Sequence, residues 1–217
     1  ARSRATAISN TNNPYAPKGH SLSSYENPLF GSIRIKAQEM CDLTILAFRM
    51  ATKWRTPAIV FADGLQGQMM ESVKLPDVED SRPDFSDWAA QGEAKTRTNL
   101  VKSIFLDAAQ QEEFNRKLQD KYAKMEEDAL SETYLADDAD ILIVGYGISS
   151  RIARTTAETL RAEGIKAGCF RPITLSPFPC KALADAAKGR KVMVIALDAG
   201  QFADDVRLNL AKAGLGE

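Results

Sequence analysis

The sequence predicts an α/β fold built on a parallel sheet, and its last third carries the evidence. Three apolar runs there, at 141–145, 165–170 and 192–197, each end in a turn that leads into a helical pattern. A strand that passes through a glycine turn into a helix presents backbone N–H groups at the helix start. Strands that alternate with helices of this length form right-handed crossovers and therefore a parallel sheet.

The final domain is expected to begin near Asp138. Its glycines mark helix ends, since Gly164 and Gly189 each follow a helical pattern at the position of a C-terminal cap. A sheet of three strands is thin, so we expect further strands to be missing. The predicted elements are strands at 139–145, 165–170 and 192–197 and helices at 149–163, 180–188 and 201–213.

A second α/β unit is predicted upstream. Apolar residues at helical spacing indicate a helix over 38–53, and a run of five apolar residues, 58–62, lies between Pro57 and an Asp-Gly turn. Such a run suits a parallel strand that is covered on both faces. The preceding strand has only a poor candidate, at 32–35, so this unit is expected to begin in mid-fold.

The middle of the chain is irregular and then helical. Proline and glycine interrupt residues 76–107, which predicts a linker or a long excursion over the surface. A charged helix is expected over 107–130, with one narrow apolar stripe formed by Phe114, Leu118, Tyr122 and Met125. We interpret the stripe as packing onto one domain; a partner-binding helix is the alternative.

Composition excludes several classes of function. A net charge of -1 gives no electrostatic case for nucleic acid or an anionic membrane. Three cysteines without a Cys-x-x-Cys pair indicate free thiols in a reducing cytoplasm and no iron–sulfur cluster or zinc site on this chain alone. His20, the only histidine, leaves little material for a Ser-His-Asp triad. No apolar run reaches the roughly 20 residues that span a bilayer, and no signal peptide is recognised.

The opening residues suggest a piece of a longer protein. The chain starts at Ala1 rather than Met, and the stretch through about Pro28 is rich in Ser, Asn, Thr, Pro and Gly. Such a segment buries little, so we expect an extended or mobile arm.

The turn at 145–150 reads Gly-x-Gly-x-x-Ser, one glycine short of the dinucleotide fingerprint. The next strand ends in Arg171 instead of the acidic residue that binds a ribose. An arginine suits a 2′-phosphate, so a weak NADP-binding interpretation stays open beside a plain strand-to-helix junction.

Polar residues follow the strands at one predicted edge. Arg171 is expected at the carboxyl end of its strand, in a loop that Pro172, Pro177 and Pro179 make rigid. Ser149 and Gln201 follow the neighbouring strands, so the three should gather there. An anion site and a subunit contact both fit this set, and a salt bridge is the favoured interpretation for Arg171.

A third turn, at 63–71, has two glycines that allow close approach of another backbone. Its paired methionines, Met69 and Met70, favour domain packing over a cofactor site. None of these turns holds a nucleophile beside a base.

Taken together, the turns resemble the alpha subunit of the 2-oxoacid:ferredoxin oxidoreductases, of the group that handles 2-oxoglutarate or branched-chain 2-oxoacids. The family patterns are Ala-Asp-Gly-x-x-Gly-Gln-Met-Met-Glu-Pro, Tyr-Gly-Thr-Ser-Ala-Arg, Arg-Pro-Ile-Thr-Leu-Trp-Pro-Phe-Pro and Asn-Ala-Gly-Gln-Met-x-x-Asp-Val-Arg. They fall here, in order, on 62–71, 146–151, 171–179 and 198–207. The resemblance covers about 37–209.

The chain departs from these patterns at single positions. Ser72 replaces Pro, Ile148 replaces Thr, Ser176 replaces Trp, and Asp198 replaces Asn; Ala196 stands where Glu is common. We expect the last four changes each to remove a polar or aromatic contact and to alter substrate and partner preference.

A larger departure concerns the first domain. Family alpha subunits begin with a thiamine diphosphate pyrimidine-binding domain that includes Tyr-Pro-Ile-Thr-Pro and Arg-Gly-Gly-Pro-Gly, and neither segment is found here. The resemblance therefore implies an arm at 1–36, the tail of the pyrimidine-binding domain at 37–75, a linker with a charged helix at 76–137 and a transketolase C-terminal-like domain at 138–217. No catalytic, cofactor-binding or metal-binding residue is carried over to this chain.

For the whole complex the resemblance implies oxidative decarboxylation of a 2-oxoacid to an acyl-CoA. Thiamine diphosphate, magnesium and iron–sulfur clusters would be the cofactors, none of them bound by this chain alone. The expected partners are a thiamine-binding beta subunit and gamma and ferredoxin-like subunits or domains. The chain would be inactive alone. A non-catalytic interaction domain and an NADP-binding protein remain the alternatives.

Overall fold

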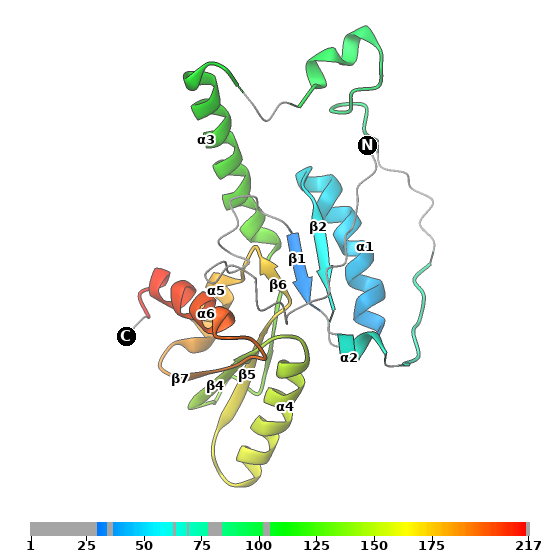
Figure 1. Ribbon diagram of the computed structural model, residues 1–217. Helices are drawn as coiled ribbons and strands as arrows, with labels where there is room; N and C mark the ends of the chain where they lie inside the picture. The colour runs from blue at the N-terminus through cyan, green and yellow to red at the C-terminus, as the bar shows by residue number, and fades with distance from the viewer. Residues whose placement is uncertain are drawn as a thin grey trace.

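The computed structural model describes residues 30–33, 37–62, 64–68, 70–77, 84–101 and 105–215. Most of the expected arm, His20, Asp63 and Met69 lie outside these ranges. Two sheets organise the chain, with strand orders β2-β1-β6 and β3-β5-β4-β7. Figure 1 shows them as two neighbouring units, with α3 extending away from both.

The first sheet confirms the predicted upstream unit. Strand β1 (Phe30–Ile33) pairs in parallel with β2 (Ala58–Phe61), and the helix α1 (Ala37–Trp54) connects them. The expected strand at 32–35 therefore begins two residues earlier. The core of this unit forms between α1 and the buried face of β2 and contains Leu43, Ala47, Ala58 and Val60.

The second sheet has a parallel centre, as predicted, and an antiparallel edge that was not predicted. Strands β4 (Ile141–Gly145), β5 (Ala167–Pro172) and β7 (Lys191–Ile195) run in parallel. Strand β3 (Ser131–Tyr134) pairs antiparallel with β5. This fourth strand begins directly after the residues predicted as the charged helix, so the sheet is mixed and one strand wider than expected.

Helices cover both faces of this second sheet (Figure 1). Alternation along β4 explains how: Leu142 and Val144 face a core shared with α5 (Cys180–Ala187) and α6 (Gln201–Lys212), whereas Ile143 faces α4 (Gly147–Ala162). A strand buried on both faces reads as a continuous apolar run, which is the pattern that predicted it.

The charged helix α3 (Ala108–Met125) is shorter than the predicted 107–130. Asp107 caps its first turn by accepting a hydrogen bond from the N–H of Ala109. A 3₁₀ turn, η3 (Glu126–Asp128), ends it. Of the apolar stripe only Met125 is fully buried, so packing of the stripe onto a domain is confirmed only at its C-terminal end.

The described part of the linker is irregular, as predicted, except for the 3₁₀ helix η2 (Ala94–Asn99). Another short helix, α2 (Gly64–Gly67), lies upstream of the linker, in the turn that follows β2. In the part of the chain that the structure describes, no helix is long and apolar enough to span a membrane.

Candidate functional site

The carboxyl edge of the second sheet brings three of the four sequence motifs together. Because β4 lies between β5 and β7 and all three are parallel, the end of β5 and the turns after β4 and β7 meet at one edge. This confirms that the segments of Ser149, Arg171 and Gln201 share an edge. The contacts across it, however, use other residues than expected.

Arg171 lies inside β5 rather than in a loop after it, because the strand continues to Pro172. Its side chain is 7% exposed and holds Glu39 with two parallel hydrogen bonds, Nη1 to Oε1 and Nη2 to Oε2, both 2.9 Å. Nη1 also lies 3.0 Å from Oε2 of Glu132, the residue directly opposite on β3. The structure therefore confirms the salt-bridge interpretation of Arg171.

The 2′-phosphate interpretation loses its main support here. Two carboxylates surround the guanidinium, and a phosphate that approached Arg171 would have to displace or face both of them. The turn before α4 packs closely against the neighbouring strand β7 instead. A Cβ on Gly145 would lie 3.2 Å from the carbonyl oxygen of Ile195, so a side chain there would crowd the neighbouring strand.

Tyr146 and Asp198 join the second and fourth motifs. The tyrosine hydroxyl donates to Oδ2 of Asp198 at 3.3 Å, and its ring packs edge-on against Phe202 with centroids 4.6 Å apart. Asp198 also accepts from the N–H of Gly200 at 2.8 Å and of Phe202 at 3.3 Å. Its carboxylate therefore orders the start of α6. The expected loss of a contact relative to the family's Asn stays a prediction, because the contacts of that Asn belong to other proteins.

Gln201 closes the same turn locally. Its Oε1 accepts a hydrogen bond from the backbone N–H of Ala199 at 2.9 Å. Ser149 is buried, 3% exposed, in the first turn of α4. Neither residue contributes a charged group, so the edge offers a set of internally satisfied polar contacts rather than an open anion site.

The first motif meets the third at the start of α1. Glu71 accepts a hydrogen bond from the N–H of Ala37 at 2.8 Å, a favourable place for a carboxylate at a helix N-terminus. Gln38 bonds both the N–H and the carbonyl of Lys74, at 2.8 and 3.0 Å. Glu39 then holds Arg171. Three consecutive residues of α1 thus contact the end of the first motif, the segment just after it and the third motif. Sequence reasoning missed this junction because Glu39 belongs to no recognised pattern.

The third motif also crosses between the sheets. After β5 ends at Pro172, the chain forms β6 (Thr174–Ser176), which pairs antiparallel with β1 of the first sheet. Thr174 is fully buried, and its hydroxyl accepts from the N–H of Leu130 at 2.9 Å. The Arg-Pro-Ile-Thr segment therefore links the two units covalently and by ion pair.

The glycines of the turn after β2 behave differently from the prediction. A Cβ added to Gly64 or Gly67 would meet no heavy atom within 4 Å, so among the described residues no backbone approaches them closely. Met70 is fully exposed at 99%, so the expected domain packing is wrong for this methionine. The residues of this turn whose burial is described, at 64, 67–68 and 70–71, are all exposed.

Two cysteine thiols are held in the protonated form. Burial raises the pKa of Cys169 to about 11, against the weaker opposing effect of Arg154. Burial also raises the pKa of Cys180, whose Sγ lies 2.7 Å from Oδ1 of Asn209. Within the described ranges no group of three or more His, Cys, Asp or Glu residues is placed to hold a metal ion.

Comparison with known proteins gives a consistent family. The family model described as the thiamine diphosphate-binding part of pyruvate flavodoxin/ferredoxin oxidoreductase matches residues 18–136, and core domain II of pyruvate:ferredoxin oxidoreductase matches 139–215. A solved 2-oxoglutarate:ferredoxin oxidoreductase from Magnetococcus marinus shares the fold, with a TM-score of 0.65 and 20% identity over 84% of this chain and 37% of that one.

Curated relatives are closer in sequence. Ketoisovalerate oxidoreductase subunit VorB of Methanothermobacter thermautotrophicus is 46% identical over 194 residues, which are 88% of this chain and 54% of the relative. The 2-oxoglutarate synthase subunit KorA of Archaeoglobus fulgidus is 31% identical over 78% of this chain and 50% of its own. The chain spans about half the length of these relatives, and it belongs to the 2-oxoacid:ferredoxin oxidoreductase family.

Proposed function

We propose that this chain is part of the alpha subunit of an oxidoreductase that decarboxylates a 2-oxoacid and transfers the acyl group to coenzyme A. The observation that carries the proposal is the 46% identity to a ketoisovalerate oxidoreductase subunit over 88% of the chain. Branched-chain 2-oxoacids are therefore the first substrates to test, ahead of 2-oxoglutarate.

The chain's own role in this proposal is structural. Thiamine diphosphate, when bound in such a complex, supplies the carbanion that attacks the 2-oxo carbon. The described residues do not fit that cofactor, since Arg171 is engaged by carboxylates and no cluster of metal ligands is placed for a diphosphate-bound ion. We therefore derive no catalytic step from these residues and assign them scaffold and interface roles.

This assignment also suggests a role for each part of the chain and for its partner subunits. We propose that 37–75 is the tail of a pyrimidine-binding domain, 76–137 a linker and 138–217 a transketolase C-terminal-like domain. A thiamine-binding beta subunit and subunits or domains that carry iron–sulfur clusters would complete a cytoplasmic complex that takes electrons from the substrate. Alone, the chain would be inactive.

Purification from the source cells tests the proposal. We expect the protein to co-purify with a thiamine-binding partner and an iron–sulfur subunit, each identified by intact mass. Recovery of a lone chain of 23.8 kDa would instead favour a non-catalytic interaction domain. The NADP-binding alternative requires tight binding of NADPH by the isolated chain, and we expect none because of the carboxylates around Arg171.

A further inference from the structure

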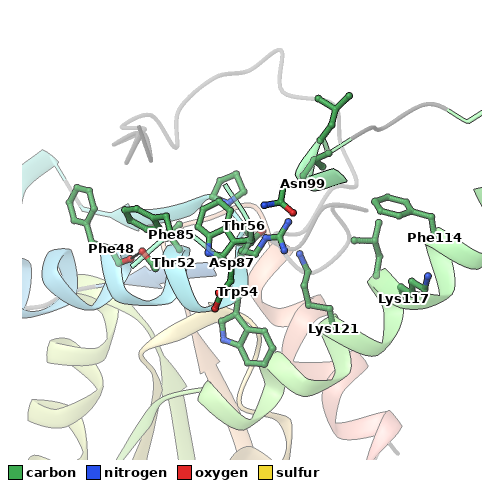
Figure 2. Close-up of a pocket in the computed structure, with 18 of the residues that line it drawn as sticks. Phe48, Thr52, Trp54, Thr56, Phe85, Asp87, Asn99, Phe114, Lys117 and Lys121 are labelled. Carbon is green, nitrogen blue, oxygen red and sulfur yellow. Dashed lines mark hydrogen bonds between the residues drawn. The ribbon is translucent and has the colours of Figure 1, made fainter. Parts of the chain in front are cut away.

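A cavity of about 880 Å³ lies outside the site described above, between the C-terminal half of α1, the linker and the middle of α3 (Figure 2). Aromatic side chains from three separate stretches of the chain form much of its wall. They are Phe48, Trp54, Phe85, Trp88, Phe105 and Phe114. The rings of Phe105 and Phe114 pack at 5.1 Å, and those of Phe85 and Trp88 at 5.4 Å.

A polar contact between the end of α1 and the residues after α3 anchors one end of the groove. Asp128, just beyond α3, accepts hydrogen bonds from Lys53 and Trp54 at the end of α1, both at 2.6 Å to Oδ2. From this anchor α3 extends away from both sheets (Figure 1). Phe114 and Leu118, in the middle of the helix, line the groove and stay half-buried.

Two cations stand in this groove close to each other. The Arg55 guanidinium lies 5.0 Å from the centre of the Trp88 ring, and Lys121 reaches toward the cavity from α3 (Figure 2). Burial lowers the pKa of Lys121, and the positive charge of Arg55 lowers it further. Among the described residues no carboxylate lies within ion-pair distance of either cation, whereas Lys117 is paired with Glu113 at 2.7 Å.

Charge complementarity therefore calls for an anionic occupant, although Asp87 also lines the cavity and makes the balance less positive. A carboxylate between Arg55 and Lys121 would relieve their mutual repulsion and gain two charge-assisted hydrogen bonds. The aromatic walls require that the same occupant also bring apolar side chains.

The surface around the cavity favours a polypeptide over a small ligand. Several apolar residues that line the groove are open to solvent, since Leu100 is 63% exposed, Val101 68% and Phe48 47%. Small-molecule sites enclose most of their ligand, while an apolar surface as exposed as this one is typical of protein contacts.

We propose that this groove docks a segment of the thiamine-binding beta subunit that carries apolar side chains flanked by carboxylates. The inference rests on the proposed function. The groove residues lie at 47–121, inside the stretch that matches the thiamine diphosphate-binding family model, which points to the subunit that shares the cofactor. An ordinary interface of this kind concentrates its affinity in a few aromatic and arginine residues.

Co-expression of the full chain with the beta subunit of its source tests the docking site. We expect R55E and K121E each to raise the dissociation constant at least about tenfold, and added salt to weaken the wild-type complex more than either variant. K124E, also on α3 but outside the groove, is the matched control and should change the constant less than about twofold. Circular dichroism of each variant checks that the chain is folded.

A photo-crosslinking amino acid at Leu100 gives a readout that needs no charge reversal. It should crosslink to a beta-subunit peptide rich in apolar and acidic residues, while the same group at the exposed Leu208 on α6 should not reach that peptide. The complex could instead form with unchanged affinity in R55E and K121E and give no crosslink from Leu100. That result would overturn the groove as the docking site and would leave the proposed function unaffected.

Two other outcomes would also overturn the inference. Failure of the chain to bind the beta subunit under any condition would remove the proposed function together with the docking site. Quenching of tryptophan fluorescence by ADP or coenzyme A, lost in the R55E and K121E variants while the subunit complex is unaffected, would assign the groove to a nucleotide instead.

Discussion

Glu39 and Arg171 lie 132 positions apart in the chain, yet they form a two-hydrogen-bond ion pair with both distances at 2.9 Å. The pair connects the first turn of α1 with the core strand β5 of the second sheet. Because Arg171 also starts the segment that forms β6 in the first sheet, this one residue joins the two units.

We expect E39Q to lower the free energy of unfolding by about 2 kcal/mol, since removal of one partner leaves a buried guanidinium with incomplete compensation. E132Q should cost less than about 1 kcal/mol, because Glu132 is 45% exposed and solvent screens it. Urea denaturation measures both.

The exposed pair of Glu112 and Arg116 provides the control for this comparison. E112Q on the surface of α3 should change stability by no more than about 0.5 kcal/mol. Equal losses in E39Q and E112Q would show that the buried pair has no special role.

The close approach of the Leu135 backbone to Gly168 leads to a second prediction about stability. A Cβ on Gly168 would lie 2.4 Å from the carbonyl oxygen of Leu135, so the backbone would have to move. G168A should therefore destabilise the protein by about 1–3 kcal/mol or more. G67A, where a Cβ meets nothing within 4 Å, should cost far less, and thermal unfolding compares the two.

Asp198 should prove important for its acceptor oxygens rather than for its charge. D198A leaves the N–H groups of Gly200 and Phe202 and the hydroxyl of Tyr146 without this acceptor, so we expect a loss of about 1–2 kcal/mol. D198N retains one acceptor oxygen and should lose under about 1 kcal/mol. An equal loss in the two variants would contradict this account.

Cys169 should make stability depend on pH in the alkaline range. In the unfolded chain the pKa of its thiol lies near the ordinary value of 9.0, whereas in the folded chain burial raises the pKa to about 11. The folded state then binds more protons, so stability falls as the pH rises from about 9 to 11. Denaturation at pH 8, 9.5 and 11 should show a smaller decline in C169A than in the wild type.

Thiol labelling gives an independent check on the same residue. At pH 8 the native protein should react with iodoacetamide slowly at Cys169, because the thiolate is the reactive form and the side chain is 5% exposed. Rapid alkylation of Cys169 in the folded protein would show that its environment is not as described.

The regular elements could be predicted because their burial is local in sequence. The continuous apolar run of β4 and the glycine ends of α4 and α5 each carry a recognisable pattern, and the structure confirms them. Strands β3 and β6 were missed for a physical reason. Both strands, at 131–134 and 174–176, are short and partly polar. Their conformation depends on pairing with β5 and β1, which lie elsewhere in the sequence.

The site was predictable only in part. Parallel strands dictated that the segments of Ser149, Arg171 and Gln201 share an edge. No sequence pattern identified Glu39 as the partner of Arg171, because an ion pair between distant segments leaves no local periodicity. The same holds for Tyr146 with Asp198, although both belong to recognised motifs.

The central claim is that this chain serves a 2-oxoacid oxidoreductase, and the electron-transfer assay of the native complex tests it most directly. The complex, purified without oxygen from the source cells, would be given ketoisovalerate, 2-oxoglutarate or pyruvate with coenzyme A and oxidised methyl viologen. We predict reduction of the viologen that requires coenzyme A and is fastest with ketoisovalerate. Absence of coenzyme A-dependent reduction with every 2-oxoacid, from a preparation that contains all its subunits, would contradict the account.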